Sequence, residues 1–98
     1  MKHCIIVKFI PEISRKIEKS FVQQIKELFE NCREIEGVHG VKVFNRCNER
    51  ENRADIMIQI DMEKSALDAY DKSDTHLMWK TEYRRFIDSK TIFDYEDE

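Results

Sequence analysis

The sequence predicts an α+β domain with a ferredoxin-like arrangement, in which four antiparallel strands and three helical segments follow the order βαββααβ. Two observations predict it. The spacing of the hydrophobic residues changes from strand-like to helical and back twice along the chain, and polar segments at 48–52 and 72–74 interrupt the pattern. The length of 98 residues fits a single domain over residues 1–98, without internal repeats.

The first half of the chain predicts a strand followed by a long helix. Residues 2–10 are rich in isoleucine, valine and phenylalanine and end at Pro11, which predicts a strand with apolar residues on both faces. Over residues 14–35 the apolar residues recur at helical spacing, on the side of the helix that faces the core. They are Ile17, Phe21, Ile25, Leu28, Cys32 and Ile35. Ser14 is the expected N-cap, and Gly37 ends the helix or begins the turn after it.

The middle of the chain predicts a β-hairpin. Residues 38–47 place Val41 and Val43 on one face of a strand. Residues 54–60 alternate isoleucine with aspartate, methionine and glutamine, as in a half-buried strand. The short polar loop between the two strands favours antiparallel pairing.

The last third predicts a broken helix and a closing strand. Residues 63–71 and 75–89 have helical spacing, and the polar residues between them interrupt the helix. Asp74 is the expected N-cap of the second helix, on which His76 falls on the same core-facing side as Trp79. Residues 90–95 predict the final strand.

Composition narrows the function classes. Hydrophobic residues make up 41% of the chain and charged residues 38%, which is typical of a globular domain with a charged surface. The net charge of −3 argues against a nucleic-acid partner. No long apolar run is present, so we expect a soluble, cytoplasmic protein with no membrane partner. Cys4, Cys32 and Cys47 lack metal-ligand spacing and are odd in number, so we expect neither a metal site nor a disulfide framework.

The sheet predicts a partner. In this fold the helices cover one face of the sheet, and the other face carries Cys4, Ile6 and either Phe44 or Val43. An apolar face left open favours association. The simplest solution is a symmetric homodimer in which the two sheets face each other.

Four segments of the chain resemble one known family. KHCIIVKF at the start, the helix that follows it, AYDKSDTH at 69–76 and IFDYE at 92–96 are together similar to the stress-responsive A/B barrel domain, or Dabb, family. The resemblance covers essentially the whole chain. It implies a dimeric α+β barrel, and the family includes plant stress-induced proteins, bacterial proteins of unknown role and a plant polyketide cyclase.

The resemblance to the cyclase implies a set of site residues. Its catalytic histidine matches His76, its hydrogen-bonding tyrosine matches Tyr70, and a pocket histidine on its first strand matches His3. The apolar pocket walls then fall near Ile5, Val7, Phe21 and Trp79. No metal is implied.

Three departures put the cyclase's own substrate in doubt. A second tyrosine of the cyclase corresponds to Ile25, and a histidine on its third strand corresponds to Ala54 or Asp55. The His-Pro that commonly precedes the family's histidine is Ser73-Asp74 here. The tyrosine–histidine pair is retained, so we carry over the pair without the substrate.

Tyr70 and His76 allow two interpretations. A neutral imidazole is a suitable general base, and a nearby phenol can donate to a developing enolate, which needs no cofactor. Alternatively, both are core residues whose polar tips are satisfied locally. The first interpretation predicts a homodimer that binds a small apolar or carbonyl-containing ligand between sheet and helices. The second predicts a non-catalytic structural or interaction protein associated with stress, and an open cavity beside the pair distinguishes the two.

Proteins with related folds suggest two further functions. A ferredoxin-like RNA binder needs exposed aromatic residues and a basic face on its central strands, whereas the strands here are mainly aliphatic or acidic. Dimeric-barrel monooxygenases share the architecture, but a shared fold alone does not imply their activity.

Overall fold

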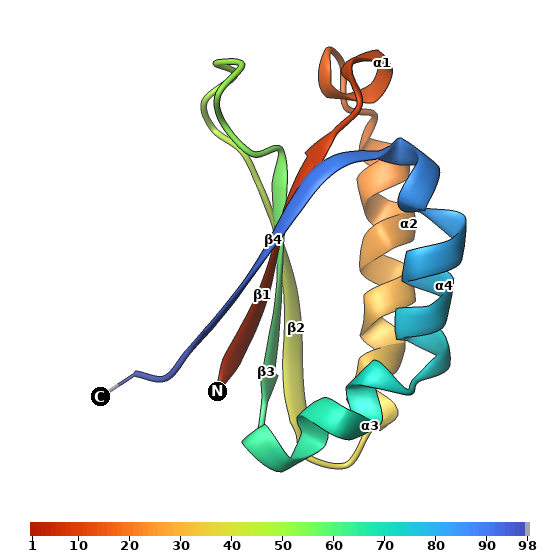
Figure 1. The fold of residues 1–98 in the computed structure, drawn as a ribbon, viewed down its shortest axis with the longest axis vertical. Helices are drawn as coiled ribbons and strands as arrows, with labels where there is room; N and C mark the ends of the chain where they lie inside the picture. The colour runs from red at the N-terminus through yellow and green to blue at the C-terminus, as the bar shows by residue number, and fades with distance from the viewer. Residues whose placement is uncertain (98) are drawn as a thin grey trace.

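The computed structural model describes residues 1–97 and has the ferredoxin-like α+β fold that the sequence predicts. Four antiparallel strands form one sheet in the order β2-β3-β1-β4, and the helices lie on one face of it (Figure 1). In chain order the elements are β1 (Lys2–Phe9), α1 (Pro11–Ser14), α2 (Lys19–Glu30), η1 (Asn31–Glu34), β2 (Val38–Asn45), β3 (Ile56–Met62), η2 (Lys64–Ala66), α3 (Leu67–Asp71), α4 (Asp74–Glu82), η3 (Arg84–Phe86) and β4 (Ile87–Tyr95).

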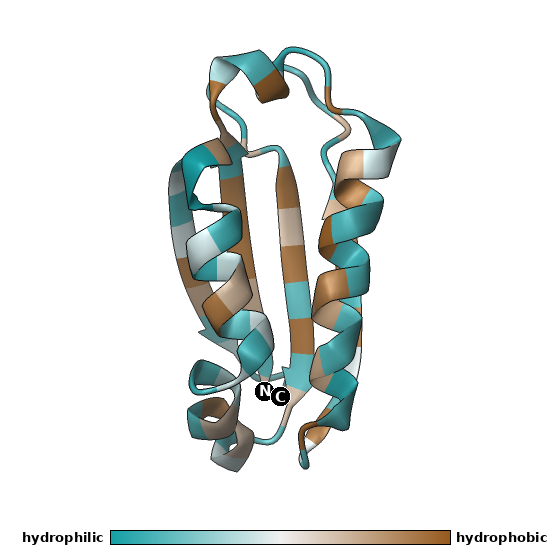
Figure 2. Cartoon of the chain, turned by 90° about the vertical axis from the view of Figure 1, so that its right-hand side faces the viewer, coloured by the Kyte–Doolittle hydropathy of each residue, from teal (hydrophilic) through white to brown (hydrophobic). Residues whose placement is uncertain are grey.

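The core lies between the sheet and the two longer helices. Every second side chain of β1 and β3 faces the helices and is buried, as the alternation predicts. These side chains meet Ile25 and Phe29 of α2 and Trp79 of α4. The rings of Phe29 and Trp79 pack edge to face with their centroids 5.2 Å apart. Figure 2 shows hydrophilic residues over much of the outer surface of both helices.

The helix predicted over residues 14–35 is shorter and begins later than its apolar spacing suggests. The chain first forms α1, with Pro11 at its first turn, and α2 begins only at Lys19. The N-cap assignment of Ser14 is wrong, because Glu18 occupies the N-cap position of α2. Ser14 instead donates a hydrogen bond from its hydroxyl to the buried carboxylate of Asp55, at 3.1 Å. The Ser14 hydroxyl thus bonds to a residue distant in the sequence and does not cap the helix that follows.

The boundaries in the second half also shift. Ser73, rather than Asp74, caps α4, since its side-chain oxygen accepts from the backbone N–H of His76 at 3.2 Å. The helix predicted over 75–89 ends at Glu82, and β4 begins at Ile87. Antiparallel pairing with β1 extends as far as Phe9 opposite Ile87, so ladder hydrogen bonds compete with the helix for these residues.

The second face of the sheet carries no helix (Figure 1). Phe44 and Phe93 lie on this open face, 43% and 58% exposed, beside the half-buried Ile6 and Met57. Val43 instead packs against the core. An exposed apolar surface of this kind is what the sequence predicts for a sheet that associates with another.

None of the helices in residues 1–97 combines the length and apolar character needed to cross a membrane. The cytoplasmic location stays a prediction. All three cysteines carry free thiols, with Cys4 and Cys32 buried and Cys47 exposed. Burial raises the pKa of the Cys32 thiol to about 11, so this thiol is protonated near neutral pH.

Candidate functional site

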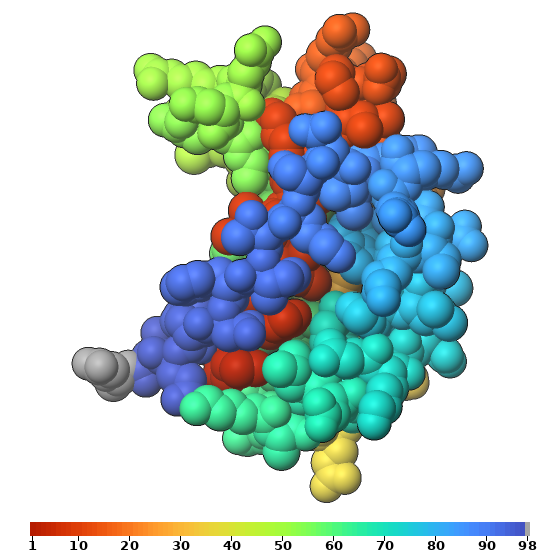
Figure 3. Space-filling view, viewed as in Figure 1, coloured from red at the N-terminus to blue at the C-terminus, as the bar shows by residue number. Residues whose placement is uncertain are grey.

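A hollow of about 290 Å³ opens between β4 and the α3–α4 segment, above β1. Figure 3 shows it as a depression between the blue strand and the teal helices, with red atoms of β1 visible inside. We call it the Tyr70 pocket. Its lining residues are His3, Ile5, Leu67, Tyr70, Asp71, His76, Trp79, Lys90, Ile92 and Asp94.

Tyr70 contributes a buried phenol to the lining of the pocket. The residue is 1% exposed, and its hydroxyl has no hydrogen-bond partner among residues 1–97. Its ring lies between two imidazoles, with centroids 5.3 Å from His3 and 5.0 Å from His76. Burial raises the pKa of the Tyr70 hydroxyl well above its usual value. The phenol therefore keeps its proton near neutral pH and is able to donate a hydrogen bond to a ligand.

His76 is held in one tautomer by the backbone. Its Nδ1 lies 2.9 Å from the carbonyl oxygen of Asp71, and a carbonyl can only accept, so Nδ1 carries the proton. In the neutral ring Nε2 then keeps its lone pair, which suits a general base. His76 is half-buried, whereas Thr75 and Trp79 form the buried side of α4. The histidine thus lies at the pocket wall, at the edge of the core-facing side on which the sequence predicts it.

Ser73 explains how residues six positions apart reach one pocket. Its hydroxyl donates to the carbonyl oxygen of Tyr70 at 2.6 Å and accepts from the backbone N–H of His76. The turn between α3 and α4 resets the helical phase, so Tyr70 and His76 point to the same side. The sequence contains a signal for this role, since Ser73 and His76 have the spacing of an N-cap and the third helical residue.

His3 pairs with an acid that the sequence analysis did not assign. Its Nδ1 lies 2.5 Å from a carboxylate oxygen of Asp94, which is its neighbour across the β1–β4 ladder. The carboxylate accepts from Nδ1 and orients the ring against Tyr70. Asp94 lies in the final FDY segment, and only the β1–β4 register brings it opposite His3.

The structure brings together five of the seven residues implied by the resemblance: His3, Ile5, Tyr70, His76 and Trp79. Val7 and Phe21 do not line the pocket. Val7 is fully buried in the core, and Phe21 packs edge to face on Phe9 and Phe86 at centroid distances of 5.3 and 5.4 Å.

Comparison with known proteins identifies the family. The sequence profile of the stress responsive A/B barrel domain, Dabb, matches residues 1–97. The chain belongs to the Dabb family. No functionally curated protein matches this Dabb chain.

Solved structures share the fold at low sequence identity. A dimeric ferredoxin-like protein of unknown function from Bacteroides fragilis is 18% identical, with a TM-score of 0.75 over 98% of this chain and 94% of that one. A dimeric ferredoxin-like protein from Thermobifida fusca is 10% identical, with a TM-score of 0.72 over 94% and 85%. A Dabb protein from Mesorhizobium loti is 11% identical, with a TM-score of 0.62 over 99% and 95%. At these identities the likeness establishes the fold alone.

Two of the three departures from the cyclase pattern, at Ile25 and at Ala54 or Asp55, lie outside the Tyr70 pocket, whereas the third includes Ser73, which bonds to Tyr70 and His76. Ile25 is fully buried in the core. Asp55 lies among Arg46, Ser14 and Lys8, where its carboxylate is held by charged and polar neighbours. This Dabb domain therefore keeps its polar pocket chemistry on β1, β4 and the α3–α4 segment.

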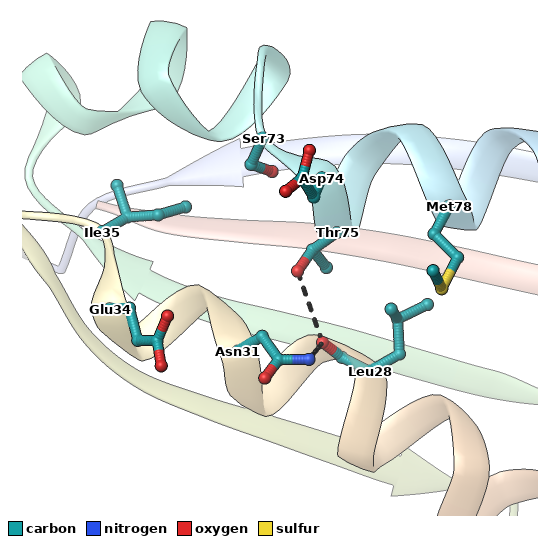
Figure 4. Close-up of a pocket in the computed structure, with 8 residues that line it drawn as sticks. All are labelled: Leu28, Asn31, Glu34, Ile35, Ser73, Asp74, Thr75 and Met78. Carbon is teal, nitrogen blue, oxygen red and sulfur yellow. Dashed lines mark hydrogen bonds between the residues drawn. The ribbon is translucent and has the colours of Figure 1, made fainter.

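A second hollow, of about 370 Å³, lies between the end of α2 and the start of α4 (Figure 4). Thr75 and Asn31 both donate to the carbonyl oxygen of Leu28 there, at 3.4 and 3.1 Å, so each already uses one donor within the protein. Within residues 1–97, no three histidine, cysteine or acidic side chains cluster as metal ligands would. The Tyr70 pocket is the better candidate, because it combines titratable groups with an unpartnered donor.

Proposed function

We propose that this Dabb domain binds a small, partly apolar carbonyl compound in the Tyr70 pocket and moves a proton at the carbon next to the carbonyl. The observation that carries the proposal is the buried hydroxyl of Tyr70, which lacks a partner among residues 1–97 and belongs to a residue that lines the pocket. A buried, unsatisfied donor is unfavourable, and a ligand acceptor would satisfy it.

In the proposed reaction the ligand's carbonyl oxygen accepts a hydrogen bond from the Tyr70 hydroxyl. His76 Nε2 takes a proton from the adjacent carbon, and the electron pair of the broken C–H bond moves to the carbonyl oxygen as an enolate. The carbonyl of Asp71 continues to accept from Nδ1 and stabilises the imidazolium that forms. Ile5, Trp79 and Ile92 supply apolar walls that limit water around the charges.

The exchange of carbon-bound hydrogen for deuterium tests this step directly. We expect the protein to accelerate deuterium uptake from D2O next to the carbonyl of aryl alkyl ketones such as 4-phenyl-2-butanone, measured by ¹H NMR. His76→Ala is expected to lower the catalysed rate by about 10²- to 10⁴-fold, because the base is lost. His39→Ala is the matched control, since His39 is exposed and bonded to Glu63 outside the pocket. Equal rates for wild type and His76→Ala would refute the proposed base.

We also propose that the domain forms a homodimer through the open sheet face. Two of the compared structures are described as dimeric, which supports this assembly. The exposed Phe44 and Phe93 are the apolar residues that a facing sheet would cover. The helix-covered face, with its pocket, remains free in such a dimer.

The Phe93→Lys variant tests the homodimer. An unpaired charge in an apolar interface is expected to weaken association roughly 100-fold or more. Light scattering across a concentration series should then show the monomer where the wild type is dimeric. Leu77→Lys is the control, because Leu77 is 60% exposed on α4, away from the open face. A Phe93→Lys protein that stays dimeric would exclude this face as the interface.

A further inference from the structure

Another hollow, which we call the basic hollow, adjoins the Tyr70 pocket between α4, η3 and β4. Its volume is about 290 Å³, and its lining residues are Trp79, Lys80, Arg84, Ile87 and Lys90. Trp79 and Lys90 line both cavities, so the two share a wall. A ligand that leaves the Tyr70 pocket along Lys90 would enter the basic hollow.

The basic hollow concentrates unpaired positive charge on a chain whose net charge is −3. Three of its five lining residues are cationic and none is acidic. Within residues 1–97, Lys80, Arg84 and Lys90 form no ion pair, although cations such as Arg46 and Lys64 elsewhere do. The neighbouring Arg85 is occupied differently, since its guanidinium lies 4.6 Å from the centroid of the Phe86 ring.

Side chains of β4 place opposite charges at the two ends of the adjoining hollows. Lys90, Ile92 and Asp94 occupy alternate positions and all line the Tyr70 pocket, so they lie on one face of the strand. The face runs from a cation through an apolar side chain to an anion, over about 13 Å at the usual strand rise. Asp94 would repel a negative group at the His3 end, whereas Lys90 and Arg84 would attract one at the other end.

From this arrangement we infer that the ligand of the Tyr70 pocket is an amphipathic keto acid. Its carbonyl lies at Tyr70 and His76, its apolar part lies against Trp79 and Ile92, and its carboxylate lies in the basic hollow between Arg84, Lys80 and Lys90. The guanidinium of Arg84 suits a carboxylate, because its donors match the two oxygens. This inference rests on the proposed function and adds the charge and orientation of the ligand.

Matched acids and esters test the inference. The probes are 5-oxo-5-phenylpentanoate, 7-oxo-7-phenylheptanoate and the methyl ester of each, titrated into the protein and followed by NMR shifts. The two lengths vary the separation of ketone and carboxylate. At low ionic strength we expect the better-fitting acid to bind about tenfold more tightly than its ester, which corresponds to about 1.4 kcal/mol. Added salt should reduce the preference, because exposed charges are screened.

Single-residue variants test whether the preference for the acid over its ester arises in the basic hollow. Arg84→Gln and Lys90→Gln are each expected to lower the acid-to-ester affinity ratio by about threefold or more, since each removes one cation. Arg85→Gln is the matched control with the same change of charge and should keep the wild-type ratio. Tyr70→Phe should weaken acid and ester alike and leave the ratio unchanged, because it acts on the carbonyl.

The outcomes separate the two proposals. Equal binding of acid and ester, with Tyr70→Phe weakening both, overturns the keto-acid inference and leaves the Tyr70 pocket as a carbonyl site. A preference for the acid that Arg85→Gln abolishes and Arg84→Gln does not also overturns it. Absence of binding by all four compounds overturns it as well, whereas deuterium uptake by neutral ketones would still support the proposed function.

Discussion

Tyr70→Phe is expected to stabilise the protein while removing its proposed activity. The hydroxyl is buried without a partner among residues 1–97, and leaving such a group unsatisfied costs about 1–3 kcal/mol. Phenylalanine keeps the ring and its contacts with His3 and His76. We therefore expect an increase of about 1 kcal/mol in the free energy of unfolding, measured with urea.

Tyr70→Phe should also no longer polarise the carbonyl group of a bound ketone. Deuterium uptake by a bound ketone is expected to fall about 10²- to 10³-fold, because a donor to the developing oxyanion is removed. A mutation that stabilises the fold and impairs the reaction is the signature of a functional polar group, since a purely structural tyrosine would not show both effects. A stability loss of about 1 kcal/mol or more would mean that the hydroxyl is satisfied in solution and would contradict this account.

Alkaline pH gives an independent measurement of the buried phenol. Burial raises the folded-state pKa of Tyr70 above the usual value of 10.0, so the unfolded chain loses this proton first as the pH rises. The stabilising contribution of the protonated phenol is complete below about pH 10 and is lost toward the folded-state pKa. Tyr70→Phe lacks this loss. Burial also raises the pKa values of Cys32 and Tyr83, but both residues are present in the wild type and in Tyr70→Phe. The difference between the two plots of unfolding free energy against pH therefore reports the ionisation of Tyr70.

The fold was predictable because its strongest signals are local. The alternation of Ile56, Ile58 and Ile60 places these side chains on one face, and all three are buried. The helical spacing that includes Ile25 likewise identifies the side of α2 that packs on the sheet. Each pattern needs only its own segment to form, so tertiary structure did not alter it.

The wrong boundaries and missed partners depend on contacts between distant segments. Ser14 has a good capping side chain, but the buried Asp55, 41 positions away, takes its hydroxyl. The pairing of His3 with Asp94 spans 91 positions and follows only from the β1–β4 register. The basic hollow is similar, because Arg84 and Lys90 converge only after η3 turns the chain back into β4. Strand register and turns bring these distant residues together, and the spacing of hydrophobic residues in the sequence does not specify either.

Asp55→Ala is expected to give the largest stability loss of any single substitution considered. The carboxylate is fully buried and accepts from the Phe9 backbone at 2.9 Å, from the Ser14 hydroxyl and from Arg46 Nη1 at 2.6 Å, with Lys8 Nζ at 3.5 Å. Alanine would leave the buried N–H of Phe9 without its acceptor and the guanidinium of Arg46 without its carboxylate partner, although Nη2 still donates to the Ser14 carbonyl. Breaking a buried ion pair in this way costs about 3–5 kcal/mol. That loss is a large share of the 5–15 kcal/mol typical of small domains, and urea unfolding will measure it.

The partly exposed ion pair of Lys2 and Asp61 provides the control. Their charged atoms lie 2.9 Å apart, but the side chains are 27% and 41% exposed, so Asp61→Ala should change stability little. If Asp55→Ala and Asp61→Ala lower the free energy of unfolding by similar amounts, burial is not the reason that the Asp55 cluster stabilises the protein. Asp55 and Tyr70 also lie toward opposite ends of β1, since Asp55 meets Phe9 and Tyr70 meets His3. Folded Asp55→Ala protein should therefore bind ligand in the Tyr70 pocket as the wild type does, whereas Tyr70→Phe should bind it more weakly and remain folded.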